Sequence, residues 1–208
     1  MRRARFGWLV VGLLTLGALA GCFQKKETTV PQSWRNASYQ GSALHKLLVI
    51  GVGKNHERRV LFEDSLVDAL ASEGVSAEAS WKSLPKVDAI EANELRDIIV
   101  SGGSDGVLLT RFVEVDVRKK IGVDPLSANP TYTVYRKSYD EIHDPSFFDP
   151  NADYRFETSL FAVETDQLVW IGRSVTVDPE SVKDGIDSLT RTVAQTLKRE
   201  GLVTPSTP

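Results

Sequence analysis

The chain has 208 residues, with 25 Lys and Arg against 28 Asp and Glu, and its formal net charge is −3. It has no basic stripe that could neutralise phosphates, which argues against a nucleic-acid or phospholipid-surface partner. Its single cysteine excludes an internal disulfide, but a chain of this length can bury a sufficient core without one.

The first 21 residues have the layout of a secretory signal. Arg2, Arg3 and Arg5 form a positive patch, and an uncharged, mostly apolar run covers residues 6–20. Because this run is shorter than the roughly 18 to 20 residues that a stable membrane-spanning helix needs, we expect a cleaved segment. Its removal leaves 22 basic residues against 28 acidic ones, about −6 for the mature chain.

The apolar run ends in Leu19, Ala20, Gly21 and Cys22, which resembles the lipobox of bacterial lipoproteins. The resemblance implies lipidation of the Cys22 sulfur and cleavage between Gly21 and Cys22. The resulting acyl chains would hold the protein on a membrane, since each buried CH₂ contributes about 0.8 kcal/mol. The alternative is an ordinary secretory signal followed by a structural cysteine.

Phe23 bears on which membrane carries the protein. In enterobacterial lipoproteins an aspartate directly after the lipidated cysteine retains the protein in the inner membrane. This chain has Phe23 instead. By resemblance, we expect an outer-membrane protein whose folded part faces the periplasm.

Three segments of the mature chain are expected from composition. Residues 22–43 are polar, contain Pro31 and Gly41 and show no sustained period, which predicts a lipidated flexible tether reaching roughly 25 Å. Residues 44–203 are expected to form one periplasmic domain. Residues 204–208 are expected to be a disordered tail.

The first half of this domain alternates between strand and helix. The continuous apolar run Leu47–Gly51 is typical of a strand covered on both faces. Asn55 can cap the helix that follows, and Gly74 can terminate it. The expected elements are a strand at 47–51, a helix at 57–72, a strand at 75–81, a helix at 89–101 and a long strand starting at 107.

The second half begins with an irregular stretch, residues 121–153, in which Thr131–Tyr139 is one possible strand. Residues 154–164 and 168–177 predict an antiparallel hairpin. Asp178 and Pro179 predict the start of a last helix, whose apolar stripe continues to its end. The stripe consists of Val182, Ile186, Leu189, Val193 and Leu197.

These elements predict an α/β (α+β) domain in the order β-α-β-α-β-β-β-α. We expect a mixed sheet of about five strands with three helices packed on it.

The domain looks like one shared by several envelope proteins. The quoted segments are LLVIGVG, FEDSLVDALASEGV, SGGSDGVLLTRFVEV, FETSLFAVETDQLVWIGRSVTV and the last helix. They resemble outer-membrane activators of penicillin-binding proteins, the amino-terminal domain of the Tol-Pal periplasmic protein, and the soluble domain of the curli secretion lipoprotein. The resemblance covers residues 45–203 except 121–153, and it implies a recognition or assembly module.

Two patterns could carry ligand chemistry. Gly51 and Gly53 lie between a strand and a helix, where backbone amides can hold a phosphate, but His56 occupies the position where a dinucleotide fingerprint has its third glycine. We therefore prefer a tight turn. The irregular stretch gathers one histidine and several carboxylates, whose spacing matches no known calcium loop. They are Asp140, Glu141, His143, Asp144, Asp149 and Asp153. We expect no metal, no cofactor and no catalytic residue.

Aromatic residues in the irregular stretch are the candidate partner surface, because aromatics are enriched at binding hot spots. The alternative, which we slightly prefer, is that they fold back and cap the sheet. The candidates are Tyr132, Tyr135, Tyr139, Phe147 and Phe148.

The sequence as a whole predicts a non-enzymatic lipoprotein that binds another envelope protein or peptidoglycan during envelope assembly or maintenance. A second hypothesis is a subunit of an oligomeric outer-membrane export assembly, with Thr131–Tyr139 as the only possible membrane strand. A hydrolase or nucleotide-binding enzyme is a third. The oligomeric state is left open.

Overall fold

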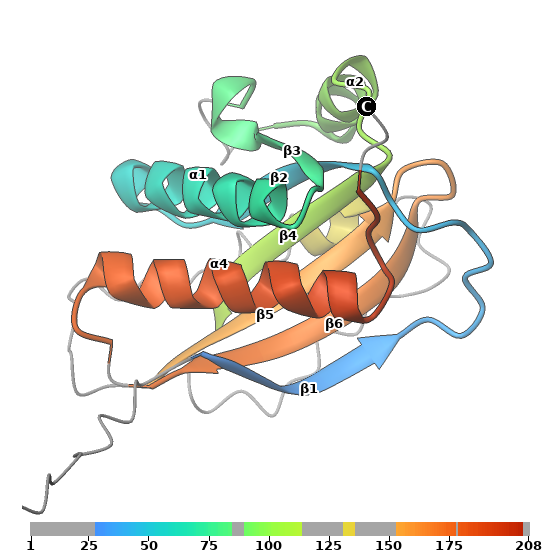
Figure 1. Ribbon diagram of the computed structural model, residues 1–208. Coiled ribbons are helices and arrows are strands. Elements are labelled where there is room, and N and C mark those ends of the chain that lie inside the picture. The colour runs from blue at the N-terminus through green and yellow to red at the C-terminus, as the bar shows by residue number, and fades with distance from the viewer. Residues whose placement is uncertain (1–27, 85–89, 114–130, 136–152, 178, 206–208) are drawn as a thin grey trace, which may run out of the picture.

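The computed structural model describes residues 28–84, 90–113, 131–135, 153–177 and 179–205. Its centre is a six-stranded sheet in the order β1-β6-β5-β4-β2-β3 (Figure 1). The strands are β1 (Thr29–Arg35), β2 (Lys46–Val52), β3 (Ser76–Ala79), β4 (Gly106–Val113), β5 (Tyr154–Ala162) and β6 (Gln167–Thr176). The named helices are α1 (His56–Ser72), the 3₁₀ helix η1 (Ser80–Lys82), α2 (Ala92–Ser101) and α4 (Val182–Arg199). The expected α/β fold with a mixed sheet is confirmed.

Strand direction places the starts of two helices at one end of the sheet. β2 pairs in parallel with β3 and β4, whereas the β4–β5, β5–β6 and β6–β1 pairs are antiparallel. β2, β4 and β6 therefore run in the same direction and finish together, and we call this end of the sheet the carboxyl edge. Because α1 follows β2 and α4 follows β6, both helices begin there and lie side by side over one face (Figure 1).

The sheet is covered on both faces, as the apolar run in β2 predicted. Leu47 and Val49 belong to a core with α1 and α4, and Leu48 and Ile50 belong to a second core with α2. Successive residues of a strand point to opposite faces, so a strand between two cores must be apolar throughout. The hairpin of β5 and β6 is also confirmed.

Both ends of α1 agree with the sequence. The Asn55 side chain accepts a hydrogen bond from the Arg58 backbone N–H at 2.9 Å. After the helix, Gly74 has a φ of +83°, a conformation that costs glycine little.

The predicted start of the last helix was wrong. Asp178 lies outside the described residues, and Pro179 precedes α4 instead of occupying its first position. Ser181 is the cap, and its hydroxyl accepts from the Asp184 backbone N–H at 3.1 Å. A serine followed three residues later by an acidic residue is also a signal for the start of a helix. The helix starts at this signal and not at the Asp-Pro pair.

The flexible tether was predicted too long. Residues 29–35 form β1, which pairs with β6 from Thr29↔Val175 to Arg35↔Trp170. β1 is an edge strand with most side chains exposed, so it has no buried face and shows no alternation of apolar and polar residues. Its register shifts between Thr29 and Gln32, which accommodates Pro31, a residue that cannot donate to a ladder.

Two further boundaries differ from expectation. Residues 131–135 are helical, so the strand predicted for Thr131–Tyr139 was wrong over the part that the structure describes. At the carboxyl terminus the Thr204 backbone N–H donates to the Leu44 carbonyl at 3.0 Å, so the ordered domain continues past residue 203. Residues 206–208 lie outside the described part.

Candidate functional site

A cavity of about 140 Å³ opens at the carboxyl edge of the sheet. The ends of three strands contribute to it through Val52 of β2, Phe112 of β4 and Thr176 of β6. In sheets with parallel strands, ligands bind outside the carboxyl ends of the strands, where the following helices begin. The position of the cavity therefore makes it the candidate functional site.

The starts of α1 and α4 flank the cavity. Asn55 and Arg58 line it from the first turn of α1, and Val182, Gly185 and Ile186 line it from the start of α4. The amino end of a helix carries a partial positive charge from its free backbone N–H groups. Two such ends at one cavity raise the local electrostatic potential, although each helix already has one N–H satisfied by its cap.

The walls of the cavity are mainly apolar. Phe62 lies on the α1 side, and three aromatic rings lie together on β4 and β5. The ring centroids of Phe112 and Phe156 are 5.6 Å apart in an edge arrangement, and those of Phe112 and Tyr154 are 6.1 Å apart. Aromatic rings in such contact hold one another in place, so this wall is preformed.

All the charged groups among the described lining residues are arginines, namely Arg58, Arg59 and Arg111. No Asp or Glu occurs in that described set, although the chain as a whole is acidic. The charged side chains that line the cavity are therefore all basic within the described residues, and two of them, Arg59 and Arg111, are paired with glutamates beside it.

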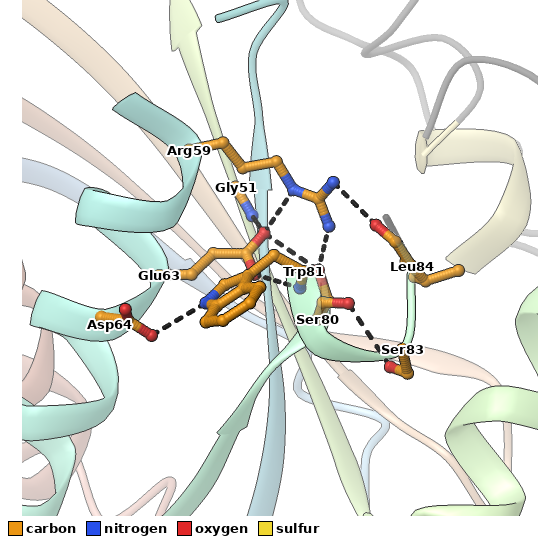
Figure 2. A network of polar contacts seen from close by, with 8 residues as sticks. All are labelled: Gly51, Arg59, Glu63, Asp64, Ser80, Trp81, Ser83 and Leu84. Carbon is orange, nitrogen blue, oxygen red and sulfur yellow. Dashed lines mark hydrogen bonds and ion pairs between the residues drawn. The ribbon is translucent and has the colours of Figure 1, made fainter. Parts of the chain in front are cut away.

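Arg59 is held by a buried network beside the cavity (Figure 2). Its Nε donates to Glu63 Oε1 at 2.8 Å, and the two side chains are 1% and 0% exposed. Its other nitrogens donate to the Leu84 carbonyl and the Ser80 hydroxyl, each at 2.9 Å. The guanidinium is thereby fixed by a carboxylate, a hydroxyl and a carbonyl.

Both oxygens of the Glu63 carboxylate accept hydrogen bonds in this network. Besides Arg59, Oε1 accepts from the Gly51 N–H and the Ser80 hydroxyl, each at 2.9 Å, and Oε2 accepts from the Trp81 N–H at 2.7 Å. Figure 2 shows these donors converging on the carboxylate from β2, α1 and η1. Burying a charge is costly unless it is paired and hydrogen-bonded, and both conditions are met here.

A second charged cluster crosses three strands. Arg111 on β4 contacts Glu157 on β5 at 3.0 Å, and Glu157 also contacts Arg173 on β6 at 2.9 Å. The three residues are direct cross-strand neighbours in the sheet register. One carboxylate is thus shared between two guanidinium groups, of which Arg111 lines the cavity.

The two glycines for which a tight turn was preferred over a phosphate loop both line the cavity, but Gly51 has another role. It belongs to β2, and its N–H is already bonded to Glu63, so it is not available to an anion. A Cβ at this position would lie 2.8 Å from Phe62 Cδ1, which explains the glycine by close packing. Gly53 follows the strand and lines the cavity.

The aromatic candidates that the structure describes are not an exposed surface. Tyr135 is 0% exposed and Tyr132 packs against the same core, with their ring centroids 6.3 Å apart. A spacing of three residues puts both rings on one side of the helical turn. They therefore fold back and cap the sheet, which was the preferred alternative to a partner surface. Tyr139, Phe147 and Phe148 lie outside the described residues, as do Gly21 and Cys22.

Of the residues considered and rejected as calcium ligands, only Asp153 belongs to the described part of the chain. Within the described ranges, no group of three or more His, Cys, Asp and Glu could hold a metal ion. None of the helices in those ranges is long and apolar enough to cross a membrane.

The sequence did not predict the cavity, although one signal for it was present. The apolar stripe of the last helix starts at Val182 and Ile186, which line the cavity. Ile186 also packs against the core that contains Leu189, Val193 and Leu197. When an apolar stripe continues past the core to the start of a helix, its first residues can line a second apolar surface, which here is the cavity.

No protein-family model matches the chain, and no curated protein matches it. Several solved structures resemble it in part. A variant of the PelC dodecamer from Paraburkholderia phytofirmans is 12% identical with a TM-score of 0.44, and the match covers 84% of this chain and 99% of that one. A second PelC dodecamer structure from the same organism is 13% identical with a TM-score of 0.43, covering 82% and 94%.

The lipoprotein GNA1162 from Neisseria meningitidis is 11% identical with a TM-score of 0.39, covering 74% of this chain and 95% of that one. With TM-scores from 0.39 to 0.44, these likenesses support no assignment of function.

Replacing Glu63→Gln is expected to lower the free energy of unfolding by about 3 to 5 kcal/mol, because it leaves the buried Arg59 guanidinium without its counter-charge. Urea unfolding followed by tryptophan fluorescence measures this loss. The matched control is Glu73→Gln, which breaks the more exposed pair with Lys198. It should cost less than about 1 kcal/mol. Equal losses for the two variants would show that the buried network contributes no more to stability than an exposed ion pair.

Proposed function

We propose that this chain is a lipid-anchored protein of the bacterial cell envelope and that its folded domain is a non-enzymatic binding module close to the membrane. The observation that carries the proposal is the lipobox-like sequence Leu19–Cys22 directly after an uncharged apolar run. Phe23 favours the outer membrane, with the domain in the periplasm. An envelope protein or peptidoglycan is the macromolecular partner that the sequence favours.

The domain starts close to the proposed anchor. Thr28 is fixed by its backbone N–H, which donates to the Ser188 hydroxyl at 2.9 Å, and by its own hydroxyl, which lies 2.7 Å from that of Thr176. Its carbonyl accepts from the Thr192 hydroxyl at 3.3 Å. Cys22 is six positions before Thr28, so even a fully extended connection spans no more than about 20 Å. This short span supports a domain held at the membrane surface.

The chemistry of the cavity supports binding more than catalysis. Its walls combine apolar and aromatic side chains with a few polar groups, as ligand pockets usually do. The hydroxyl of Thr110, one of its polar lining residues, is engaged with that of Thr158 at 2.9 Å. A cavity of about 140 Å³ is too small for a folded partner or a glycan strand, so it suits one small group of a ligand.

The anchor is tested by growing the native host with labelled palmitate. The wild-type protein should incorporate the label, sediment with membranes and, in a density gradient, follow the outer membrane. Cys22→Ser removes the only thiol, so incorporation of the label should be lost completely. Mass spectrometry of the mature amino terminus is the control for cleavage before Cys22. A wild-type protein without label, or one that begins elsewhere, would contradict the proposal.

A second candidate function, as a subunit of an oligomeric assembly, is favoured by the edge of the sheet. Among the strands that the structure describes, β1 pairs with β6 alone, and Trp34 on this strand is 50% exposed. A strand at a sheet edge presents backbone groups to which another chain can add, and tryptophan is enriched at interfaces.

This second candidate predicts a defined oligomer in mild detergent that Trp34→Ser weakens by about tenfold in dissociation constant, since the loss of a buried Trp contact costs 1 kcal/mol or more. Multi-angle light scattering over a dilution series measures it. Val100→Ser, which alters another exposed apolar side chain, is the control. A monomer at all concentrations would rule the candidate out.

A further inference from the structure

The cavity lies at the end of the domain where the chain arrives from the proposed anchor. Thr176, which lines the cavity, is bonded through its hydroxyl to Thr28, the first described residue. Since Cys22 is six positions earlier in the chain, the attachment point of the proposed acyl chains is within about 20 Å of Thr28. If the chain is anchored as proposed, the cavity is therefore next to the lipid headgroups.

The size and walls of the cavity suit a short apolar segment. Its volume of about 140 Å³ is close to that of an engineered protein cavity of roughly 150 Å³ that binds benzene. It can thus enclose about six carbon atoms. Phe112 and Phe156 of the aromatic wall, together with Phe62 on the α1 side, provide the apolar contacts for them.

The charges at the same place suit a phosphate. Arg58 and Arg111 line the cavity between the amino ends of α1 and α4, and the described lining residues include no carboxylate. Arg111 and Arg173 share the Glu157 carboxylate, so two of these three described residues are basic and one is acidic. Arginine and helix amino ends both favour phosphate oxygens, by charge-assisted hydrogen bonding and by the helix dipole.

We propose that the cavity binds an anionic phospholipid of the membrane that carries the protein. The phosphate lies at the rim near Arg58 and the start of α1, and the first carbons of one acyl chain pack against the aromatic wall. This inference rests on the proposed anchoring. A neutral acyl group would use only the apolar wall, whereas a phospholipid uses both the wall and the cationic rim.

The test uses the full acylated protein in phosphatidylcholine nanodiscs that contain a small fraction of phosphatidic acid with a photoreactive diazirine near the carbonyl end of one chain. After irradiation and digestion, adducts should map to peptides of the cavity, such as the first turns of α4. A matched diacylglycerol with the same diazirine reports apolar binding without the phosphate. We expect at least about tenfold less cavity adduct from it, as the loss of a charged hydrogen bond implies.

Two variants separate the wall from the rim. Val182→Trp fills the cavity and should remove the adducts for both lipids. Arg58→Gln should lower the phosphatidic acid adduct about tenfold and leave the diacylglycerol adduct unchanged. The control for the latter is Arg191→Gln at an exposed position of α4. Because Arg58 is only partly buried, its variant remains informative even if Val182→Trp fails to fold.

Equal labelling by the two lipids, or adducts outside the cavity, would overturn the proposal. The intact mass of the starting protein distinguishes this failure from failure of the anchor. A protein without acyl chains that still gives phosphate-dependent cavity adducts would refute the anchoring and support the binding site. An acylated protein without such adducts would do the reverse.

Discussion

The Glu63 carboxylate joins the segments that position the cavity, because it accepts hydrogen bonds from β2, α1 and η1 at once. Its partner Arg59 extends the same network to the Leu84 carbonyl. The orientation of α1 on the end of β2 is thereby fixed by charged and directional contacts as well as by apolar packing. Such a contact tolerates little displacement, since a shift would leave a buried charge without its partners.

This constraint connects the fold to the cavity. Fixing α1 at the carboxyl edge sets the positions of Phe62 and Arg58, which line the cavity from that helix. On the other side, α4 starts at the same edge because β6 runs in the direction of β2. The cavity is the space between two helix starts and the ends of the strands. The positive potential at its rim has two sources. One is the arginines, and the other is the amino ends of α1 and α4, which strand direction brings to the same edge.

Much of the fold could be predicted from the sequence because its central elements have strong local patterns. The apolar run of β2, the Asn55 cap of α1 and the β5–β6 hairpin each have a signal within a few residues. β1 could not be predicted, since an exposed edge strand is held by backbone pairing and leaves no pattern of buried side chains. The helical turn at 131–135 was missed because its β-prone Tyr and Val residues are held there by tertiary packing.

The site was harder to predict than the fold. Its lining residues come from two helix starts and three strand ends, separated along the chain by more than a hundred residues. No local spacing connects Arg58 with Arg111 or Val182. The sequence contained the glycines after β2 and the start of the α4 stripe, but only the strand order brings these two features together.

If the chain is anchored as proposed, the carboxyl edge of the sheet faces the membrane. If Cys22 is acylated, a cysteine introduced at the exposed Glu180 or at the exposed Ser72 is the only thiol that a spin label can reach. Glu180 precedes α4 at the carboxyl edge, and Ser72 ends α1, which at 1.5 Å per residue extends about 25 Å away from that edge. With a paramagnetic relaxation agent attached to lipid headgroups, the label at 180 should relax faster than the label at 72. Equal relaxation at the two sites, or faster relaxation at 72, would contradict the account.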